Sequence, residues 1–589
     1  MSNSPPIVIL HAAADARHCV EHGLHRHGAI YSTYAGLEVY LAERYGVACT
    51  CLSRFLSTED ALGLKERASR VVDSVLDSLD ATVSREIARS TGWDMRWFRA
   101  LYSYIGKYHL LAYMSLAEAV RRLRTRHHGA RLHVYNFKFN RYLDTSSDMD
   151  RFLSACFPDL PAEIVSPPGN APARQGRDWH TDRAQPILRR ILRRTLVPWH
   201  THFRRPRIVS GRPSVLLIQP LYQMEFLLRE LTDFNAVVWR ENGFPEKEGG
   251  APTGSASQLT WNTDTLPSAD PCCSLFLQDI QEDFAKQFPR SVRQISAVAA
   301  QHKNTPFSVA VWGNSPCEGM RAVLTEYLRS IGVPVVGGQH GNVYGDSYEP
   351  WHFDSDFNRC DVFLTFGFTE CDLKNLYPDR QIRTRVVPVG YLNKVHAVRR
   401  RKPVDLVFPL TNSYALVAEG MNRLLPHDLV DRQRSLLSFL GSVPSATVVV
   451  KPVCHPCIDT CPTLPIFEKM RNLRVISDIT FVEFLRTHAP NAVLLDFPGM
   501  PLFEAIRLDA ELLVMDDPIH PFSPHALDLL KKRAYYTADL SEMVGFLALF
   551  FEGRLEKKRD DSFARHYVRD GNTRRLILDL LRHCVQGAR

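Results

Sequence analysis

Two polar segments in the C-terminal half of the chain each follow an apolar run that is typical of a buried strand. The first segment, Lys451–Pro456, comes directly after Thr447–Val450. Lys451 and the imidazole of His455 could donate hydrogen bonds to phosphate oxygens. Pro456 helps to keep the segment rigid, so that less entropy is lost when a ligand binds. These residue types indicate a site for a phosphorylated ligand.

Cysteines around this first segment allow a second interpretation. Cys454, His455, Cys457 and Cys461 could ligate zinc, although their spacing matches no standard structural zinc site closely. A plain structural turn is the third interpretation. The thirteen cysteines of the chain are scattered and sit mostly inside apolar runs, which is typical of a protein from a reducing compartment. We therefore expect a cytoplasmic location.

The second polar segment, Asp496–Glu504, follows the apolar run Ala492–Leu495. Gly499 makes its backbone flexible, and Pro501 suits the first turn of a helix. The free N–H groups of such a helix N-terminus attract phosphate, and the carboxylate of Glu504, one turn later, could reach a ribose diol. Because the carboxyl ends of parallel strands meet at one edge of a sheet, we expect the two polar segments to lie side by side.

A third segment, Gly337–Gly345, follows the apolar run Val333–Val336 and contains four glycines. Glycines allow a backbone to turn sharply and to approach a ligand closely. Gln339, His340 and Gly341 lie at the centre of this segment. At a strand end, His340 could act as a base, as an acid or as a donor to phosphate. A glycine-rich connection with an incidental histidine is the alternative.

Histidines near the N-terminus are further candidates for a general base. His11 ends the apolar run Ile7–Leu10, and His25 and His27 lie in a segment that we expect to be a loop. The first loop of a doubly wound domain lies at its ligand-binding edge, so we predict His11 and His27, with His340, as candidate catalytic residues. Histidines that are merely exposed or hydrogen-bonded are the alternative.

An acidic cluster follows the glycine-rich segment. Asp354 and Asp356, with His352 nearby, could hold a metal ion. An isolated Asp-x-Asp pair is common on ordinary protein surfaces, however. We therefore expect no metal and no other cofactor.

Apolar runs that alternate with helical patterns predict the scaffold that carries these segments. Such runs are typical of strands in a parallel sheet that is covered by helices on both faces. The runs are Ile7–Leu10, Leu132–Phe137, Val215–Ile218, Ala236–Trp239, Phe307–Trp312, Val333–Val336, Val362–Phe366, Val404–Phe408, Thr447–Val450, Leu473–Ile476, Ala492–Leu495 and Glu511–Met515. Helical patterns include residues 61–124, Leu275–Phe288, Met320–Ile331, Phe481–Thr487 and Pro501–Leu508.

A chain of 589 residues is too long for one hydrophobic core, since single cores stop growing at about 250–300 residues. The sequence therefore predicts an α/β fold with two Rossmann-like domains that face each other across a cleft. We place the domains at residues 1–390 and 391–589. The first domain is enlarged by the helical stretch 61–124 and by a basic linker, 166–213.

The net charge of +8 is concentrated in part in this linker. Within residues 186–207, apolar side chains recur close to helical spacing with arginines on the opposite face. Such a helix could lie on an anionic membrane surface, or it could pack on a domain with its arginines in solvent. Few aromatic residues accompany the basic run, so we expect no nucleic acid partner.

The motifs resemble those of a known family. Gln339–Gly341, Asp361–Gly367, Val389–Gly390, Lys451–Pro456 and Asp496–Ala505 are similar to segments of the bacterial surface-carbohydrate transferases. These are GT-B glycosyltransferases of capsule and lipopolysaccharide assembly, including Kdo- and sialyltransferase-like enzymes. The resemblance covers about residues 333–518. Two departures from the family pattern leave the nucleotide of the donor open.

This resemblance implies a glycosyltransferase that moves a sugar from a nucleotide-activated donor to a glycan or lipid-linked glycan acceptor, without a metal. His455 and Pro456 would contact the donor nucleotide, and Glu504 would contact its ribose. The first domain would bind the acceptor. Enzymes of this kind work in the cytoplasm, in some cases on the inner face of the plasma membrane. The alternatives are a CDP-polyol phosphotransferase of the teichoic-acid type and a non-catalytic or nucleic-acid-binding protein that uses the arginine-rich linker.

Overall fold

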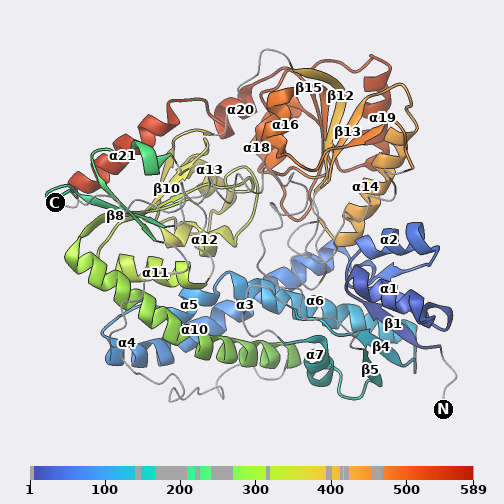
Figure 1. The fold of residues 1–589 in the computed structure, drawn as a ribbon, viewed down its shortest axis with the longest axis horizontal. Helices are drawn as coiled ribbons and strands as arrows, with labels where there is room; N and C mark the ends of the chain where they lie inside the picture. Colours follow the sequence, from blue (N-terminus) through green and yellow to red (C-terminus); the bar gives the residue numbers. More distant parts are fainter. Residues whose placement is uncertain are drawn as a thin grey trace, which may run out of the picture.

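The described part of the chain folds into three parallel β-sheets that are flanked by helices (Figure 1). The computed structural model describes residues 5–139, 143, 147–165, 209–218, 224, 226–239, 270–313, 319–392, 401–411, 416, 424–452, 466 and 469–587. The α/β class predicted from the alternating apolar runs is confirmed by these sheets.

The N-terminal sheet has the strand order β3-β2-β1-β4-β5, and all its pairs are parallel. Its strands are β1 (Ile7–Leu10), β2 (Ala29–Ser32), β3 (Thr50–Cys51), β4 (Leu132–Tyr135) and β5 (Ala162–Val165). The helices α1 (Ala13–Glu21), α2 (Gly36–Tyr45) and α7 (Met149–Cys156) accompany it. Every residue of β1 is buried, as its unbroken apolar sequence predicts.

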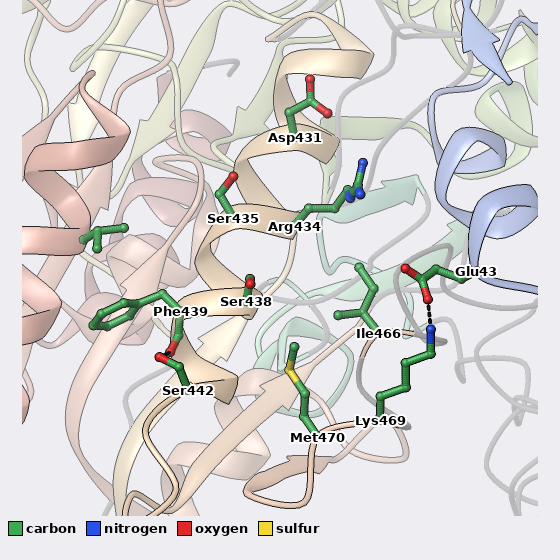
Figure 2. A pocket seen from close by; sticks show the side chains of 11 residues that line it. Glu43, Asp431, Arg434, Ser435, Ser438, Phe439, Ser442, Ile466, Lys469 and Met470 are labelled. Carbon is green, nitrogen blue, oxygen red and sulfur yellow. Dashed lines mark hydrogen bonds and ion pairs between the residues drawn. The ribbon is translucent and has the colours of Figure 1, made fainter. Parts of the chain in front are cut away.

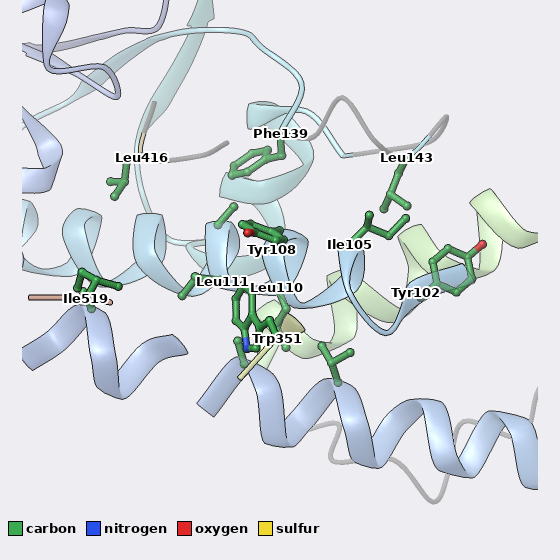
Figure 3. Close-up of a cluster of buried hydrophobic side chains, with 14 of the residues drawn as sticks. Tyr102, Ile105, Tyr108, Leu110, Leu111, Phe139, Leu143, Trp351, Leu416 and Ile519 are labelled. Atoms are coloured by element: carbon green, nitrogen blue, oxygen red, sulfur yellow. The ribbon is translucent and has the colours of Figure 1, made fainter. Parts of the chain in front are cut away.

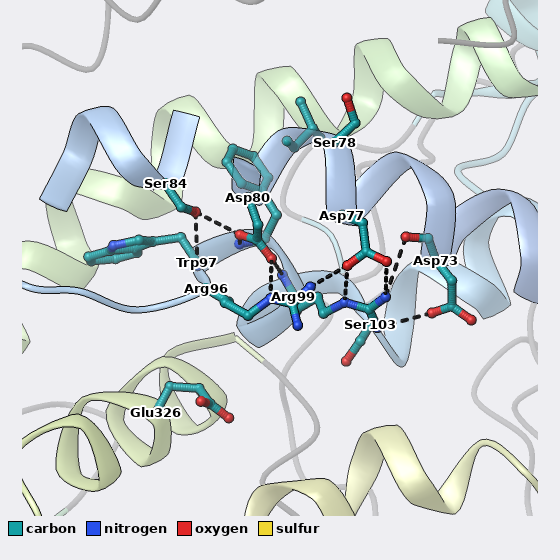
Figure 4. A network of polar contacts seen from close by, with 12 residues as sticks. Asp73, Asp77, Ser78, Asp80, Ser84, Arg96, Trp97, Arg99, Ser103 and Glu326 are labelled. Carbon is teal, nitrogen blue, oxygen red and sulfur yellow. Dashed lines mark hydrogen bonds and ion pairs between the residues drawn. The ribbon is translucent and has the colours of Figure 1, made fainter. Parts of the chain in front are cut away.

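A layer of long helices separates this sheet from the next one (Figure 1). It contains α3 (Thr58–Leu79), a π-helical turn (Asp80–Ser84), α4 (Arg85–Thr91), α5 (Trp97–Tyr102), α6 (Ile105–Arg126) and α10 (Pro271–Asn304). The buried carboxylate of Asp80 accepts hydrogen bonds from the backbone N–H groups of Phe98 and Arg99, which ties α5 to the π-helical turn (Figure 4). The helices from α3 to α6 confirm the helical stretch predicted at 61–124.

The middle sheet has the order β11-β10-β9-β8-β6-β7. Its strands are β6 (Ser214–Ile218), β7 (Asn235–Trp239), β8 (Phe307–Trp312), β9 (Val335–Gly338), β10 (Val362–Thr365) and β11 (Arg385–Pro388). Around it lie α9 (Leu227–Glu230), α11 (Gly319–Ser330), α12 (His352–Ser355) and α13 (Glu370–Leu376). The last helix of the chain, α21 (Thr573–Gly587), packs Ile577 and Leu581 into the core of this sheet.

The C-terminal sheet has the order β14-β13-β12-β15-β16-β17. Its strands are β12 (Lys402–Pro409), β13 (Val448–Lys451), β14 (Leu473–Val475), β15 (His488–Leu495), β16 (Glu511–Met515) and β17 (Tyr535–Thr537). Its helices are α14 (Pro426–Gly441), α16 (Phe481–Thr487), α17 (Met500–Ala505), α18 (Pro524–Arg533), α19 (Leu540–Phe551) and α20 (Ser562–Tyr567).

One hydrophobic core joins segments that follow strands of different sheets. Trp351 follows β9, Ile519 follows β16 and Leu416 follows β12, and all three belong to the core cluster that includes helix α6 (Figure 3). The ring of Tyr108 on α6 meets the Trp351 ring edge-on, with 4.8 Å between centroids. The helical layer therefore supports the region where the carboxyl ends of the strands converge.

Residues 1–390, which we predicted as one enlarged domain, carry two separate sheets, the N-terminal and the middle one. The proposed boundary near Gly390 remains a prediction, and helix α21 lies on the sheet that precedes this boundary. The basic linker at 186–207 lies outside the described residues. None of the described helices has the length and hydropathy needed to span a membrane.

Candidate functional site

The segments that follow β9, β15 and β16 touch one another, so the carboxyl edges of the middle and C-terminal sheets meet. Asn342 donates from its side-chain amide to the carbonyl of Pro498. Ser347 and Phe522 form an isolated antiparallel bridge, and the Tyr348 N–H donates to the Pro521 carbonyl at 3.0 Å. Residues separated by more than 150 positions are thereby brought to one place, as the predicted site requires.

His340 lies in this region with 33% of its side chain exposed. Its Nδ1 is 2.8 Å from the hydroxyl of Tyr344 and 3.9 Å from Oδ1 of the buried Asp356. Desolvation lowers the pKa of His340, while the negative charge of Asp356 opposes that shift. The imidazole is therefore neutral at neutral pH, as a general base must be.

The glycine-rich segment around His340 is held from within. The side chain of Gln339 accepts from the Phe366 N–H at 2.7 Å and donates to the Gly341 carbonyl at 2.8 Å. Val343 has φ of +65°, which is rare and strained for a β-branched residue. Gln339 thus joins the ends of β9 and β10, a role that its sequence position did not reveal. Contact of Gln339 or Gly341 with a ligand stays a prediction.

Asp496 follows β15, but its carboxylate points into the protein. It accepts hydrogen bonds from the Thr411 hydroxyl at 2.7 Å and from the Gln433 amide at 2.6 Å, and none of its surface is exposed. Burial raises the pKa of Asp496, and the bonds from Thr411 and Gln433 oppose this rise. The predicted ligand-binding carboxylate is thus engaged in tying β15 to the segment after β12.

Lys451 and Glu504 lie near each other at the same edge. The ammonium of the buried Lys451 donates to the carbonyls of Ile476 and Ile479, at 3.1 and 2.6 Å. Burial raises the pKa of Glu504 to about 8, and the charge of Lys451 opposes the rise. Glu504 is therefore protonated in most molecules at neutral pH, so that it can donate a hydrogen bond as well as accept one.

Helix α17, which was expected to seat a phosphate, is short. Gly499 precedes its first residue, Met500, and Pro501 lies in its first turn, as predicted. It has only six residues, however, and the dipole of so short a helix is small. His455 and Pro456 lie outside the described residues, as do Cys454, Cys457 and Cys461, so their predicted roles stay predictions.

The two N-terminal candidates lie at opposite edges of their sheet. His11 follows β1 and its Nδ1 is 2.8 Å from the hydroxyl of Thr33. The Thr33 carbonyl accepts from the Leu416 N–H at 2.8 Å, so this edge faces the C-terminal sheet. His27 directly precedes Gly28 and β2 and is exposed at the amino edge. Its predicted place in the first loop at the ligand-binding edge is therefore wrong.

His11 also differs from His340 in how it is held. Its ring stacks on Phe137 with 4.1 Å between centroids. Burial lowers the pKa of His11 to about 4. The chain on both sides is fixed by Asp15, whose carboxylate accepts from the N–H groups of His11 and Ala12. His11 can act as a neutral hydrogen-bonding group at the carboxyl edge of the N-terminal sheet.

Sequence reasoning missed a buried charged cluster that joins all three regions of the chain. Glu349 Oε2 lies 2.7 Å from both Lys65 Nζ and His520 Nε2, and His520 Nδ1 lies 2.6 Å from Asp517. Burial raises the pKa of Glu349, but Lys65 and His520 outweigh this and hold it well below its usual range. No local spacing could have revealed the cluster, because its members lie far apart in sequence.

The acidic pair considered for a metal has other partners. Asp354 forms an ion pair with the buried Lys107 at 2.6 Å, and Asp356 accepts from the Ser355 hydroxyl at 2.5 Å. Within the residues that the structure describes, no group of three or more His, Cys, Asp or Glu side chains is arranged to hold a metal ion.

A groove of about 820 Å³ runs along helix α14 (Figure 2). Asp431, Arg434, Ser435 and Ser438 line one side, and Met470, which precedes β14, lines another. The groove contains none of the predicted site residues.

No family model and no curated protein matches this chain. Among solved structures, it is similar to a UDP-GlcNAc 2-epimerase from Neisseria meningitidis bound to UDP-GlcNAc (11% identity over 63% of this chain and 100% of that chain, TM-score 0.36). It is also similar to a UDP-N-acetylglucosamine 2-epimerase from Listeria monocytogenes (10%, 63% and 97%, TM-score 0.40) and to the wall teichoic acid polymerase TagF (9%, 68% and 95%, TM-score 0.31). Values this low carry no argument about activity, and the α/β assignment rests on the sheets themselves.

Proposed function

We propose that this protein is a glycosyltransferase that takes its sugar from a nucleotide-activated donor. The observation that carries the proposal is the meeting of the carboxyl edges of the middle and C-terminal sheets through Asn342 and Pro498. Ligands of open parallel sheets bind at the carboxyl ends of the strands. Two such edges that meet can hold a donor on one side and an acceptor on the other.

In this proposal the C-terminal sheet holds the donor. Glu504 hydrogen-bonds the ribose, and the backbone around Gly499 receives the phosphates. The ammonium of Lys451, which the carbonyls of Ile476 and Ile479 hold at the edge, offsets the charge of the leaving phosphate.

The middle sheet supplies the base. His340 is neutral and partly exposed, and it belongs to the same segment as Asn342, which contacts the segment that follows β15. It takes the proton of an acceptor hydroxyl, which then attacks the anomeric carbon of the donor sugar. A glycan or lipid-linked glycan is the acceptor class that the sequence motifs favour.

A thermal-shift screen of the full chain against UDP, CMP, GDP and CDP tests the donor assignment. One nucleotide should raise the melting temperature selectively, because a ligand that binds only the folded state stabilises it. Glu504→Gln should reduce that rise, whereas Glu556→Gln, at an exposed glutamate, should not. If none of the four nucleotides shifts the wild-type protein, the proposal fails.

The released product then decides the reaction type. Sugar transfer releases the nucleoside phosphate of the donor and leaves no phosphate on the acceptor. Release of CMP with phosphate retained on the acceptor would instead show a CDP-polyol phosphotransferase. Quantifying CMP and acceptor-bound phosphate in the same reaction separates the two.

A further inference from the structure

Two thiols outside the candidate site lie next to each other, although 116 positions separate them in the chain. Cys156 is the last residue of α7 and Cys272 is the second residue of α10, and their sulfur atoms are 3.8 Å apart. Asp270 caps α10 by accepting from the Cys272 N–H at 2.8 Å, and Pro271 begins the helix. The start of α10, and with it the position of Cys272, is therefore set by the local sequence.

The packing of α7 against α10 is held by contacts beyond the two thiols. The side chain of Arg151, on α7, donates to Gln278 at 3.1 Å and to Glu282 at 2.7 Å, both on α10. The inner side of α7 is buried in the hydrophobic core that also contains Cys272. Cys156 and Cys272 thus meet at an interface that the fold itself maintains.

A disulfide bond between these thiols needs only a small movement of the two sulfur atoms. They must approach from 3.8 Å to the roughly 2.05 Å of an S–S bond, a shift of about 1.8 Å. Rotation about the Cα–Cβ bonds can supply this shift while α7 and α10 stay in place. Cys273 follows Cys272 directly, but consecutive side chains of a helix point in directions about 100° apart. The two cysteines of α10 therefore do not face α7 in the same way.

The two thiols differ in accessibility and in ease of ionisation. Cys156 is half-buried, whereas Cys272 is 2% exposed. The hydrogen bond from Cys272 lowers the pKa of the Cys156 thiol, although burial and the charge of Asp270 oppose this shift. The same hydrogen bond, together with burial, raises the pKa of the Cys272 thiol. Because the thiolate is the attacking species, Cys156 reacts first and Cys272 second.

We infer that Cys156 and Cys272 are a redox modification site, which forms a reversible disulfide within the native fold when a low-molecular-weight disulfide is the oxidant. The Cys156 thiolate attacks the small disulfide, whose S–S bond breaks, and one half leaves as a thiolate that takes up the proton lost by Cys156. The Cys272 thiolate then attacks the sulfur of Cys156 in the mixed disulfide. The second half leaves and takes up the proton of Cys272. Two protein thiols are oxidised, and one small disulfide is reduced to two thiols.

This disulfide covalently joins two layers of the fold. Helix α7 accompanies the N-terminal sheet, whereas α10 belongs to the helical layer and leads into β8 of the middle sheet. A cross-link between residues 116 positions apart restricts the unfolded chain, so the oxidised protein should be the more stable form. In a reducing compartment such bonds are transient, so we expect this one to form when small disulfides accumulate. None of these steps involves the proposed nucleotide-sugar site.

Oxidised glutathione added to the full chain tests this assignment. Free thiols are then blocked with N-ethylmaleimide, and peptide mass spectrometry of the unreduced digest should find a Cys156–Cys272 cross-link. Its mass should lie about 2 Da below the sum of the two reduced peptides, and dithiothreitol should reverse it. The cross-linked protein should melt at a higher temperature than the same protein after treatment with dithiothreitol.

Single substitutions separate this pair from the other thiols. The cross-link should persist in Cys273→Ser, which removes the adjacent buried thiol. In Cys272→Ser a glutathione adduct should remain on Cys156, whereas in Cys156→Ser the buried Cys272 should stay unmodified. Cys371, an exposed thiol on α13, is the internal control and should carry glutathione in every variant.

Several results would overturn the inference. One is a cross-link from Cys156 to Cys273, and another is a glutathionylated Cys371 without any Cys156–Cys272 cross-link. A cross-link that lowers the melting temperature would show that the bond does not fit the native fold. An equal yield of the cross-link in concentrated urea would show that the fold does not select this pair, since the thirteen cysteines of the unfolded chain are free to combine.

Discussion

The carboxyl edges of the middle and C-terminal sheets use their polar side chains in different ways. At the middle edge, His340 is partly exposed and lies against the Tyr344 hydroxyl. At the C-terminal edge, Asp496 is fully buried and engaged by Thr411 and Gln433. The middle edge thus exposes its polar group, His340, whereas the C-terminal edge buries Asp496 in hydrogen bonds within the protein.

This difference shows what a strand-end motif means physically. A polar residue after a strand must satisfy its hydrogen bonds somewhere, either with the neighbouring loops or with a ligand. Asp496 finds its partners in segments that come more than sixty positions earlier in the chain. His340 finds its partner, the Tyr344 hydroxyl, within its own segment, and a third of its side chain stays exposed.

The largest effect should come from the cluster that joins the two edges. Glu349→Ala leaves the Lys65 charge buried without its carboxylate, which costs about 3–5 kcal/mol of unfolding free energy. Urea unfolding monitors the loss. Glu370→Ala is the control, because Glu370 pairs with Lys374 on the surface and exposed pairs contribute at most about 1 kcal/mol. Equal losses of unfolding free energy in the two variants would show that the buried cluster contributes no more to stability than an exposed ion pair.

Asp496 and His340 should differ strongly in their contribution to stability. Asp496→Ala removes the acceptor of buried donors from Thr411 and Gln433 and should cost about 2–4 kcal/mol of unfolding free energy. His340→Ala, at a partly exposed ring, should cost less than about 1 kcal/mol. Thermal and urea unfolding of both variants give the comparison. A stable Asp496→Ala variant that has lost nucleotide binding would restore Asp496 as a ligand contact.

Much of the scaffold could be predicted from the sequence because its strands are continuous apolar runs. Phe307–Trp312 and Glu511–Met515 were predicted with the bounds that the structure has. The short strands β2 and β3 were missed, since Tyr31 and Ser32 look like part of a polar loop. The division of residues 1–390 between two sheets could not be predicted, because apolar runs do not reveal which strands pair.

The candidate site was predictable only as a set of strand-end segments. Their contact, through Asn342 and Pro498, depends on how the sheets pack, which local patterns do not encode. The sequence likewise could not show that Asp496 points inward, or that His27 lies at the amino edge. His340 and Glu504 stay candidates. Within the described residues, no hydrogen bond turns the His340 ring away from the place where the two sheet edges meet, and none engages the carboxyl group of Glu504.

Two glycines of the middle edge should differ in how well they tolerate a side chain. A Cβ at Gly345 would lie 2.3 Å from Phe368, whereas one at Gly341 would find its nearest neighbour at 4.0 Å. Gly345→Ala should therefore cost about 1–3 kcal/mol through overpacking. Gly341→Ala should leave the melting temperature unchanged and weaken nucleotide binding only if a ligand approaches that backbone closely. Thermal unfolding with and without nucleotide measures both effects.

A different kind of effect, a change with pH, should appear in the stability at Glu504. Because burial raises its pKa to about 8 from 4.5, the folded protein holds a proton that the unfolded chain releases between these values. Its contribution to stability is therefore complete below about pH 4.5 and is lost as the pH rises toward 8. Glu504→Gln, which cannot ionise, should lose less unfolding free energy than the wild type between pH 5 and 8. Urea unfolding at several pH values measures the slopes, with the exposed Glu556→Gln as control. Parallel slopes in the wild type and Glu504→Gln would show that Glu504 ionises in the folded protein as it does in the unfolded chain, and its role as a hydrogen-bond donor to the ligand would be lost.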